Sequence, residues 1–199
     1  MENKKSNRKR LETNNQRKYP KHRKSVRTIL RSTNKYRKMQ KAIKKAQKEK
    51  TGISKYGLLK LLHKTKNFIG VFAEDQLRNL SITSFPSFLV VNLDSSYMRG
   101  SHWIALRISS ESIEIFDPLG FQILNWPRIP CHLLQFLQRW SSHRQTSLCP
   151  VIQSKKSVLC GYFCLFFILC RQFMSFQRIL SHFKIRKCND NRLIKFFLY

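Results

Sequence analysis

The stretch VIQSKKSVLCGYFCLFFILC, from Val151 to Cys170, decides the fold. It begins with a polar loop and continues into an apolar run of 13 residues from Val158. That run is shorter than the roughly 18 residues that span a bilayer, so it predicts a buried helix. The stretch also holds three of the six cysteines of the chain, and a glycine follows the first of them.

The spacing of these three cysteines allows several roles. Cys160, Cys164 and Cys170 lack the paired C-x2-C knuckles of structural zinc sites, which argues against a metal. A disulfide between Cys160 and Cys164 is geometrically feasible but disfavoured in a reducing compartment. Cys164 and Cys170 are therefore predicted to be small buried hydrophobic residues.

Cys160 differs because it stands where the polar loop meets the start of the predicted helix. Unpaired N–H groups and the positive end of the helix dipole favour a thiolate there, and Gly161 allows close approach of another chain segment. Cys160 is thus a candidate nucleophile, although a structural role is the commoner fate of a lone core cysteine. A nucleophile needs a base.

His102 and Asp117 supply the remaining groups of a candidate triad. The segment HWIALRI (102–108), a polar SSES turn, and SIEIFD (112–117) with its alternating isoleucines predict an antiparallel hairpin. The start of one strand then lies beside the end of the next, so Asp117 would orient the His102 ring. Turn preferences alone would favour a structural role for Asp117. Gln153, just upstream of Cys160, is a candidate oxyanion donor or an ordinary loop residue.

The rest of the pattern predicts an α+β fold of one domain. A helix should begin near Ser54 as its N-cap, residues 88–93 should form a buried strand, and residues 131–140 an amphipathic helix. We expect the nucleophile at the N-terminus of a central helix that packs on a small mixed or antiparallel sheet. The domain is predicted to cover residues 51–199.

Residues 1–50 form a basic arm with 20 Lys and Arg against 3 acidic residues. We expect residues 1–38 to be disordered, and residues 39–50 to form a short helix with a thin apolar face. The charge predicts sequence-independent binding of DNA or RNA through phosphates, and a nuclear-import signal is the plainer interpretation.

The compartment and assembly are predicted from absences in the sequence. No apolar segment follows the charged start, so we expect no secretory signal and reduced thiols inside a cell. We expect a monomer without membrane contact.

Three motifs carry a resemblance to a known family. GSHW (100–103), IEIFDPLGF (113–121) and Q-S-x5-C-G-x-F (153–163), in the order His, acid, Gln, Cys, resemble the adenovirus-type cysteine endopeptidases. These adenain-like proteases also occur in Maverick/Polinton DNA transposons, and the resemblance covers roughly residues 53–170. It implies His102 as general base, Asp117 as orienting acid, Cys160 as nucleophile and Gln153 as oxyanion donor.

The resemblance also implies a biological role. Members of this family cleave viral precursor proteins during capsid maturation, and adenain uses viral DNA as a cofactor. We therefore expect viral precursor substrates, a location in the host nucleus and virion, no cofactor for the chemistry itself, and DNA as an activator. Adenain has Glu where this chain has Asp117, and more than the 39 residues that follow Cys160 here. Adenain also has a cysteine that forms a disulfide with an activating viral peptide, and in this chain Cys149 lies in the loop before Gln153.

Two alternatives stay open. The chain would be a nonenzymatic nucleic-acid-binding virion protein if the site were degenerate, or a deconjugase if its substrates were ubiquitin-like modifiers. Selective labelling of Cys160 separates the first from a protease, and a substrate panel separates the second.

Overall fold

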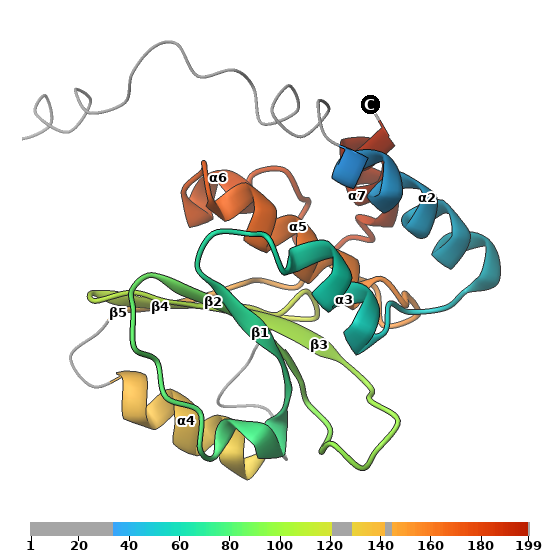
Figure 1. Ribbon diagram of the computed structural model, residues 1–199. Coiled ribbons are helices and arrows are strands. Elements are labelled where there is room, and N and C mark those ends of the chain that lie inside the picture. Colours follow the sequence, from blue (N-terminus) through green and yellow to red (C-terminus); the bar gives the residue numbers. More distant parts are fainter. Residues whose placement is uncertain (1–33, 121–128, 142–144, 199) are drawn as a thin grey trace, which may run out of the picture.

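A computed structural model describes residues 34–120, 129–141 and 145–198, and its elements form an α+β fold as predicted (Figure 1). In chain order the elements are α2 (Asn34–Glu49), α3 (Lys55–Leu62), β1 (Phe68–Ala73), the 3-10 helix η1 (Glu74–Leu77), β2 (Ser87–Asn92), β3 (Trp103–Ile108), β4 (Ser112–Phe116), α4 (Cys131–Ser141), β5 (Gln145–Leu148), α5 (Cys160–Arg171), α6 (Phe176–Leu180) and α7 (Asp190–Leu198).

The five strands form one mixed sheet in the order β1-β2-β3-β4-β5. The three central strands β2, β3 and β4 are antiparallel neighbours, and each edge strand runs parallel to its neighbour. The predicted strand at 88–93 and the predicted hairpin are confirmed. No expectation covered β5, because its residues QTSL are mostly polar and exposed.

Side chains of the central strands alternate between two cores. On β2, Phe88 and Val90 face one core while Leu89 and Val91 face the other. Strand side chains point to opposite faces with a period of two, so a continuous apolar run is what a doubly covered strand requires. Helices α2, α3, α5, α6 and α7 lie over one face, and α4 with η1 lies over the other (Figure 1).

Helix α5 is the centre of the larger core. Every residue from Cys160 to Cys170 is buried, and the ring of Phe167 stacks on Phe116 of β4 with centroids 4.6 Å apart. Cys164 and Cys170 are fully buried, and the Cys164 thiol donates to the Trp103 carbonyl at 3.3 Å. Their predicted packing role is confirmed, and all six cysteines are free thiols.

The start of α5 lies against the segment that leads into α3. Ser54 caps α3 as predicted, because its hydroxyl accepts from the Gly57 N–H at 3.1 Å. A Cβ at Gly161 would collide with Ile53 and press on the Trp103 ring. Glycine is therefore required after Cys160 so that these segments can meet.

Part of the basic segment before residue 51 is folded onto the domain. Residues 34–49 form α2, whose Met39, Ile43 and Ala46 are buried in the larger core. The Tyr162 hydroxyl of α5 also donates to the Ala42 carbonyl at 3.1 Å. The folded unit thus begins before the predicted boundary at 51, because three apolar residues at helical spacing suffice when a partner face exists. The predicted disorder of residues 1–38 is wrong for residues 34–38, which belong to α2, and residues 1–33 lie outside the described residues.

Replacing Ile43 by alanine is expected to lower the free energy of unfolding by about 2–5 kcal/mol, since its side chain is fully buried. Urea denaturation of the full chain measures this, with the exposed Lys44→Ala on the same helix as control, expected within about 0.5 kcal/mol of the parent. An equal free energy of unfolding for the two variants would mean that α2 does not contribute to the core and that the domain begins at residue 51.

The 39 residues after Cys160 supply two more helices. On α7, Leu193 and Phe197 are fully buried beside α5 and α2. These helices support the central helix that carries Cys160. None of the helices in the described ranges has the length and apolarity that a bilayer crossing needs.

Candidate active site

The hairpin brings His102 and Asp117 together at one end of the sheet. His102 immediately precedes β3, and Asp117 immediately follows β4. His102 Nε2 lies 2.7 Å from Asp117 Oδ1, and both side chains are buried. The same carboxylate oxygen accepts from the Leu119 N–H at 2.9 Å. The carboxylate is therefore held from two sides and can fix the orientation of the ring.

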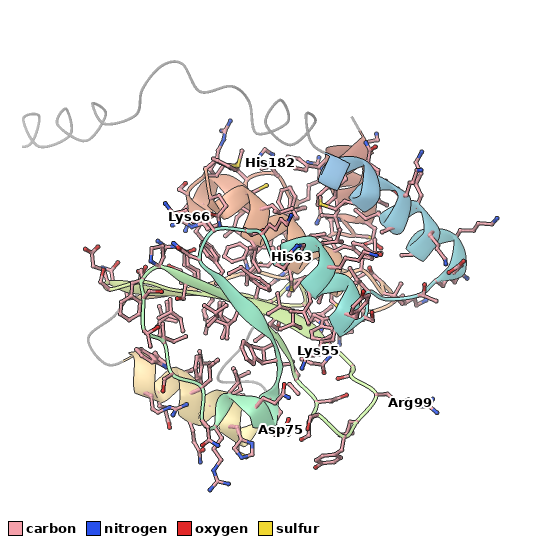
Figure 2. The ribbon with its side chains drawn as sticks, in the orientation of Figure 1. Lys55, His63, Lys66, Asp75, Arg99 and His182 are labelled. Atoms are coloured by element: carbon pink, nitrogen blue, oxygen red, sulfur yellow. The ribbon has the colours of Figure 1, made fainter. Side chains whose placement is uncertain are left out.

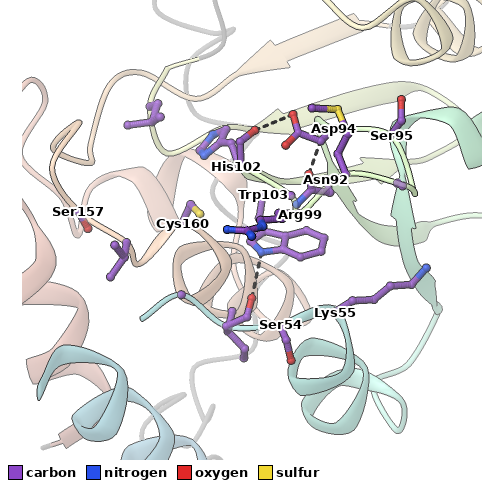
Figure 3. Close-up of a pocket in the computed structure, with 18 of the residues that line it drawn as sticks. Ser54, Lys55, Asn92, Asp94, Ser95, Arg99, His102, Trp103, Ser157 and Cys160 are labelled. Atoms are coloured by element: carbon purple, nitrogen blue, oxygen red, sulfur yellow. Dashed lines mark hydrogen bonds between the residues drawn. The ribbon is translucent and has the colours of Figure 1, made fainter. Parts of the chain in front are cut away.

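Cys160 is the first residue of α5, and its side chain lies near His102 in the site (Figure 3). Asp117 occupies Nε2, so Nδ1 is the ring nitrogen that remains for the thiol, and Cys160 is among the groups that raise the pKa of His102.

The pKa of His102 is set by opposing causes. Burial alone would lower the pKa of His102. The hydrogen-bonding and electrostatic interactions of the ring with Asp117 and Cys160 outweigh burial and raise the pKa of His102 to about 9. The imidazole is consequently protonated near neutral pH. A protonated imidazole can give its proton to a leaving group.

The raised pKa predicts the alkaline side of the pH profile. The ring gives a proton to a leaving group only while it is charged, so kcat/KM should fall as pH rises through about 9. The charged pair also stabilises the fold fully below about 6.5, the pKa of an unperturbed histidine, and this contribution is lost as pH rises through about 9. A profile of kcat/KM measured from about pH 5 to about pH 10 locates this alkaline decline, because the range includes both pKa values of the histidine. A decline centred near pH 6.5, an approximate value for an unperturbed histidine, would contradict the pairing of His102 with Asp117 and Cys160.

Gln153 lies near the site with its amide partly engaged. Its Nε2 donates to the Ser157 carbonyl at 2.9 Å, and its backbone N–H donates to the Pro118 carbonyl at 2.8 Å. The Pro118 contact connects the Gln153 loop to the turn after Asp117. An amide nitrogen carries two protons, so one N–H remains after the Ser157 bond. That remaining N–H is the group that an oxyanion would need.

His102 and Cys160 line a cavity of about 820 Å³ (Figure 3). Its walls are the segment before α3, the loop between β2 and β3, and the loop before α5. Trp103 belongs to this wall and donates from its indole to the Ile53 carbonyl at 3.1 Å. The sequence predicted no role in the cleft for Trp103.

Sequence reasoning also missed Asn92 at the end of β2. Its side chain is buried, lines the cavity, and accepts from the Asp94 N–H at 2.9 Å. Gly100 approaches it closely with φ of +84°, and a Cβ there would lie 2.8 Å from the Asn92 amide. The signal that could have identified Asn92 is a polar residue at the end of an apolar strand.

Cys149 is placed unfavourably for a disulfide with an incoming peptide. Its thiol is buried, donates to the Pro150 carbonyl at 3.2 Å, and has its pKa raised well above the ordinary value by burial. A protonated, inaccessible thiol exchanges slowly. Among the described cysteines, Cys131 and Cys188 are the exposed ones.

A thiol at a helix N-terminus, facing a histidine that a carboxylate orients, is the arrangement of cysteine hydrolases. The comparisons with known proteins agree with this class. The family model for the adenovirus endoprotease matches residues 68–196. Since that match covers more than half of the chain, the chain belongs to the adenovirus endoprotease family and is a viral cysteine protease that acts on protein substrates.

Two relatives are named "Protease". One, from Ovine adenovirus D serotype 7, is 26% identical over 151 residues, covering 67% of this chain and 70% of the relative. The other, from Bovine adenovirus 4, is 27% identical over 130 residues, covering 57% of this chain and 60% of the relative.

Proposed function

We propose that this protease cleaves viral capsid or core precursor proteins during virion maturation, with Cys160, His102 and Asp117 as its catalytic residues. The observation that carries the proposal is the pairing of His102 with Asp117 at 2.7 Å beside a cysteine that begins α5. That group opens to a cavity large enough for several residues of an extended peptide.

The chemistry follows from the ion pair. The Cys160 thiolate attacks the carbonyl carbon of the scissile peptide, and the His102 imidazolium gives its proton to the leaving amine as the C–N bond breaks. Water then attacks the thioester with neutral His102 as base, which releases the carboxylic acid and restores the protonated ring. Asp117 holds the ring so that one nitrogen faces the sulfur throughout.

The oxyanion that forms in each step needs donors. The backbone N–H of Cys160 at the helix start and the remaining amide N–H of Gln153 are the groups we assign to it. The Ser157 carbonyl and the Pro118 carbonyl would hold the Gln153 side chain and backbone in place.

Substrate identity is tested by fragment mapping. Viral structural precursors encoded beside this chain are co-expressed with it, and ubiquitin-like fusions serve as the parallel panel. Discrete fragments from the precursors that are missing with Cys160→Ala support a maturation protease. Cleavage of the fusions alone would instead indicate a deconjugase, and no cleavage of either would favour the nonenzymatic virion protein.

DNA tethering through residues 1–50 is a second part of the proposal. This segment holds 20 of the 39 cationic residues, and a chain that neutralises phosphates gains affinity by releasing counterions. DNA held this way would keep the protease near packaged precursors, and we propose DNA as an activator on the same basis.

The tether predicts a strong salt dependence. For the full chain, log K for duplex DNA of any sequence should fall linearly with log salt, with a slope of about −0.9 per neutralised phosphate. Deletion of residues 1–33, which hold 12 Lys and Arg, should make this slope several units shallower. An unchanged slope would place DNA binding elsewhere or reduce the segment to a nuclear-import signal.

A further inference from the structure

A second cluster of reactive side chains lies on the face of the sheet opposite α5. Glu74 begins η1, and Cys131 and His132 are the first two residues of α4. One ligand atom from each lies within 4.8 Å of the other two. Carboxylate oxygen, thiol sulfur and imidazole nitrogen are the three ligand types that zinc takes in proteins.

The distances within this cluster are close to those of a coordination sphere. His132 Nδ1 lies 3.0 Å from Glu74 Oε2 and 3.7 Å from Cys131 Sγ. Ligands at tetrahedral zinc, with zinc–ligand bonds of about 2.0–2.3 Å, are about 3.3–3.6 Å apart. Small side-chain adjustments would therefore place an ion between the three atoms.

Surrounding groups hold the cluster in place. Glu74 is buried, and its other oxygen accepts from the Ser95 hydroxyl at 2.8 Å, which fixes the carboxylate as an outer hydrogen bond does at metal sites. The neighbouring Asp75 adds negative charge, and it accepts hydrogen bonds from the N–H and the hydroxyl of Ser96, both at 2.7 Å (Figure 2).

We infer that Glu74, Cys131 and His132 bind a zinc-class divalent cation, with water in the fourth position. Binding displaces the proton of the Cys131 thiol into solvent and leaves His132 neutral with Nδ1 as ligand. The ion pair of Glu74 with His132 would by itself account for those two residues. Cys131 is consequently the residue that distinguishes a metal site from an ion pair.

The position of this site gives it a structural consequence for the protease. Ser95 and Ser96, which contact Glu74 and Asp75, also line the active-site cavity. A cation on Glu74 would fasten α4 and η1 to the loop that forms one wall of the cleft. The site is separate from Cys160 and His102, so its existence does not depend on the catalytic proposal.

The test uses the full chain with Cys160→Ala, because a catalytic cysteine and histidine would also bind zinc. Zinc is titrated against a chromophoric chelator in a non-thiol reductant. Cobalt is titrated in parallel, since sulfur-to-cobalt charge transfer and intense visible bands report a tetrahedral thiolate site. Matched variants are Cys131→Ser and Cys188→Ser, which both change an exposed cysteine.

We expect one zinc per chain, a cobalt spectrum with thiolate character, and a raised melting temperature with zinc. Cys131→Ser should abolish the charge-transfer band and weaken zinc binding at least about tenfold, whereas Cys188→Ser should change neither. The inference is overturned if Cys131→Ser binds zinc as tightly as its parent, or if the parent binds no stoichiometric zinc. Circular dichroism of each variant verifies that the fold is intact.

Discussion

Replacing Cys160 by alanine is expected to lower kcat by on the order of 10⁶-fold, the loss seen when a protease loses its nucleophile. The helix, the cavity and the His102–Asp117 pair would remain, so substrate binding should be nearly unchanged. Cleavage of a peptide that spans a mapped precursor site measures the rate.

The matched control is Cys188→Ala, which removes an exposed thiol outside the cleft. Its activity should equal that of the parent. Melting curves of both variants distinguish loss of chemistry from loss of fold. If Cys160→Ala retained more than about a hundredth of the parent rate, another residue would have to be the nucleophile.

Replacing Asp117 by asparagine should lower kcat by up to about 10⁴-fold, the cost of losing the acid in the related serine triad. The amide is nearly isosteric, so the fold should persist while the ring loses its orienting charge. Asp117 is also among the groups that raise the pKa of His102 to about 9. The alkaline limb of the rate profile should accordingly move to lower pH in this variant.

The shift of the limb makes this prediction specific to the proposed role. A purely structural turn residue would lower stability and rate together and leave the limb in place. Glu114 of β4 provides no substitute charge, because its oxygens are bound to Arg107 and Arg171. An unshifted limb in a folded Asp117→Asn variant would contradict the orienting role.

The site geometry was largely predictable because local patterns determine it. Two strand-like segments, 102–108 and 112–117, joined by a short polar turn specify a hairpin, and a hairpin necessarily brings residue 102 near residue 117. The polar-to-apolar transition before Gly161 specifies a helix start, so Cys160 could be placed at its N-terminus. The contact between these two elements required only that both pack in one core.

The predicted domain boundary at residue 51 was wrong because local patterns do not show burial by distant segments. Lysine-rich composition indicated an arm, but Met39, Ile43 and Ala46 needed only a partner face to become buried. That face is formed by α5 and α7, which come more than 100 residues later in the sequence. Local hydrophobic density cannot reveal burial that a distant segment provides.

The Glu74–Cys131–His132 cluster was also beyond sequence reasoning. No pattern around His132 indicated a partner, because Glu74 lies 58 positions away in the chain. Only the packing of α4 against η1 brings them together. The place of Trp103 in the cleft wall depends likewise on a remote partner, the carbonyl of Ile53.

Reaction of the full chain with a thiol-directed electrophile at about pH 6, mapped by mass spectrometry, tests the central claim most directly. An ordinary thiol is only about 0.3% thiolate there, so exposure alone gives Cys131 and Cys188 little reactivity. The account predicts that Cys160, although mostly buried, is modified at least about tenfold faster than either, and that His102→Ala removes this preference. Faster modification of Cys131 and Cys188 than of Cys160 in the parent chain would contradict it.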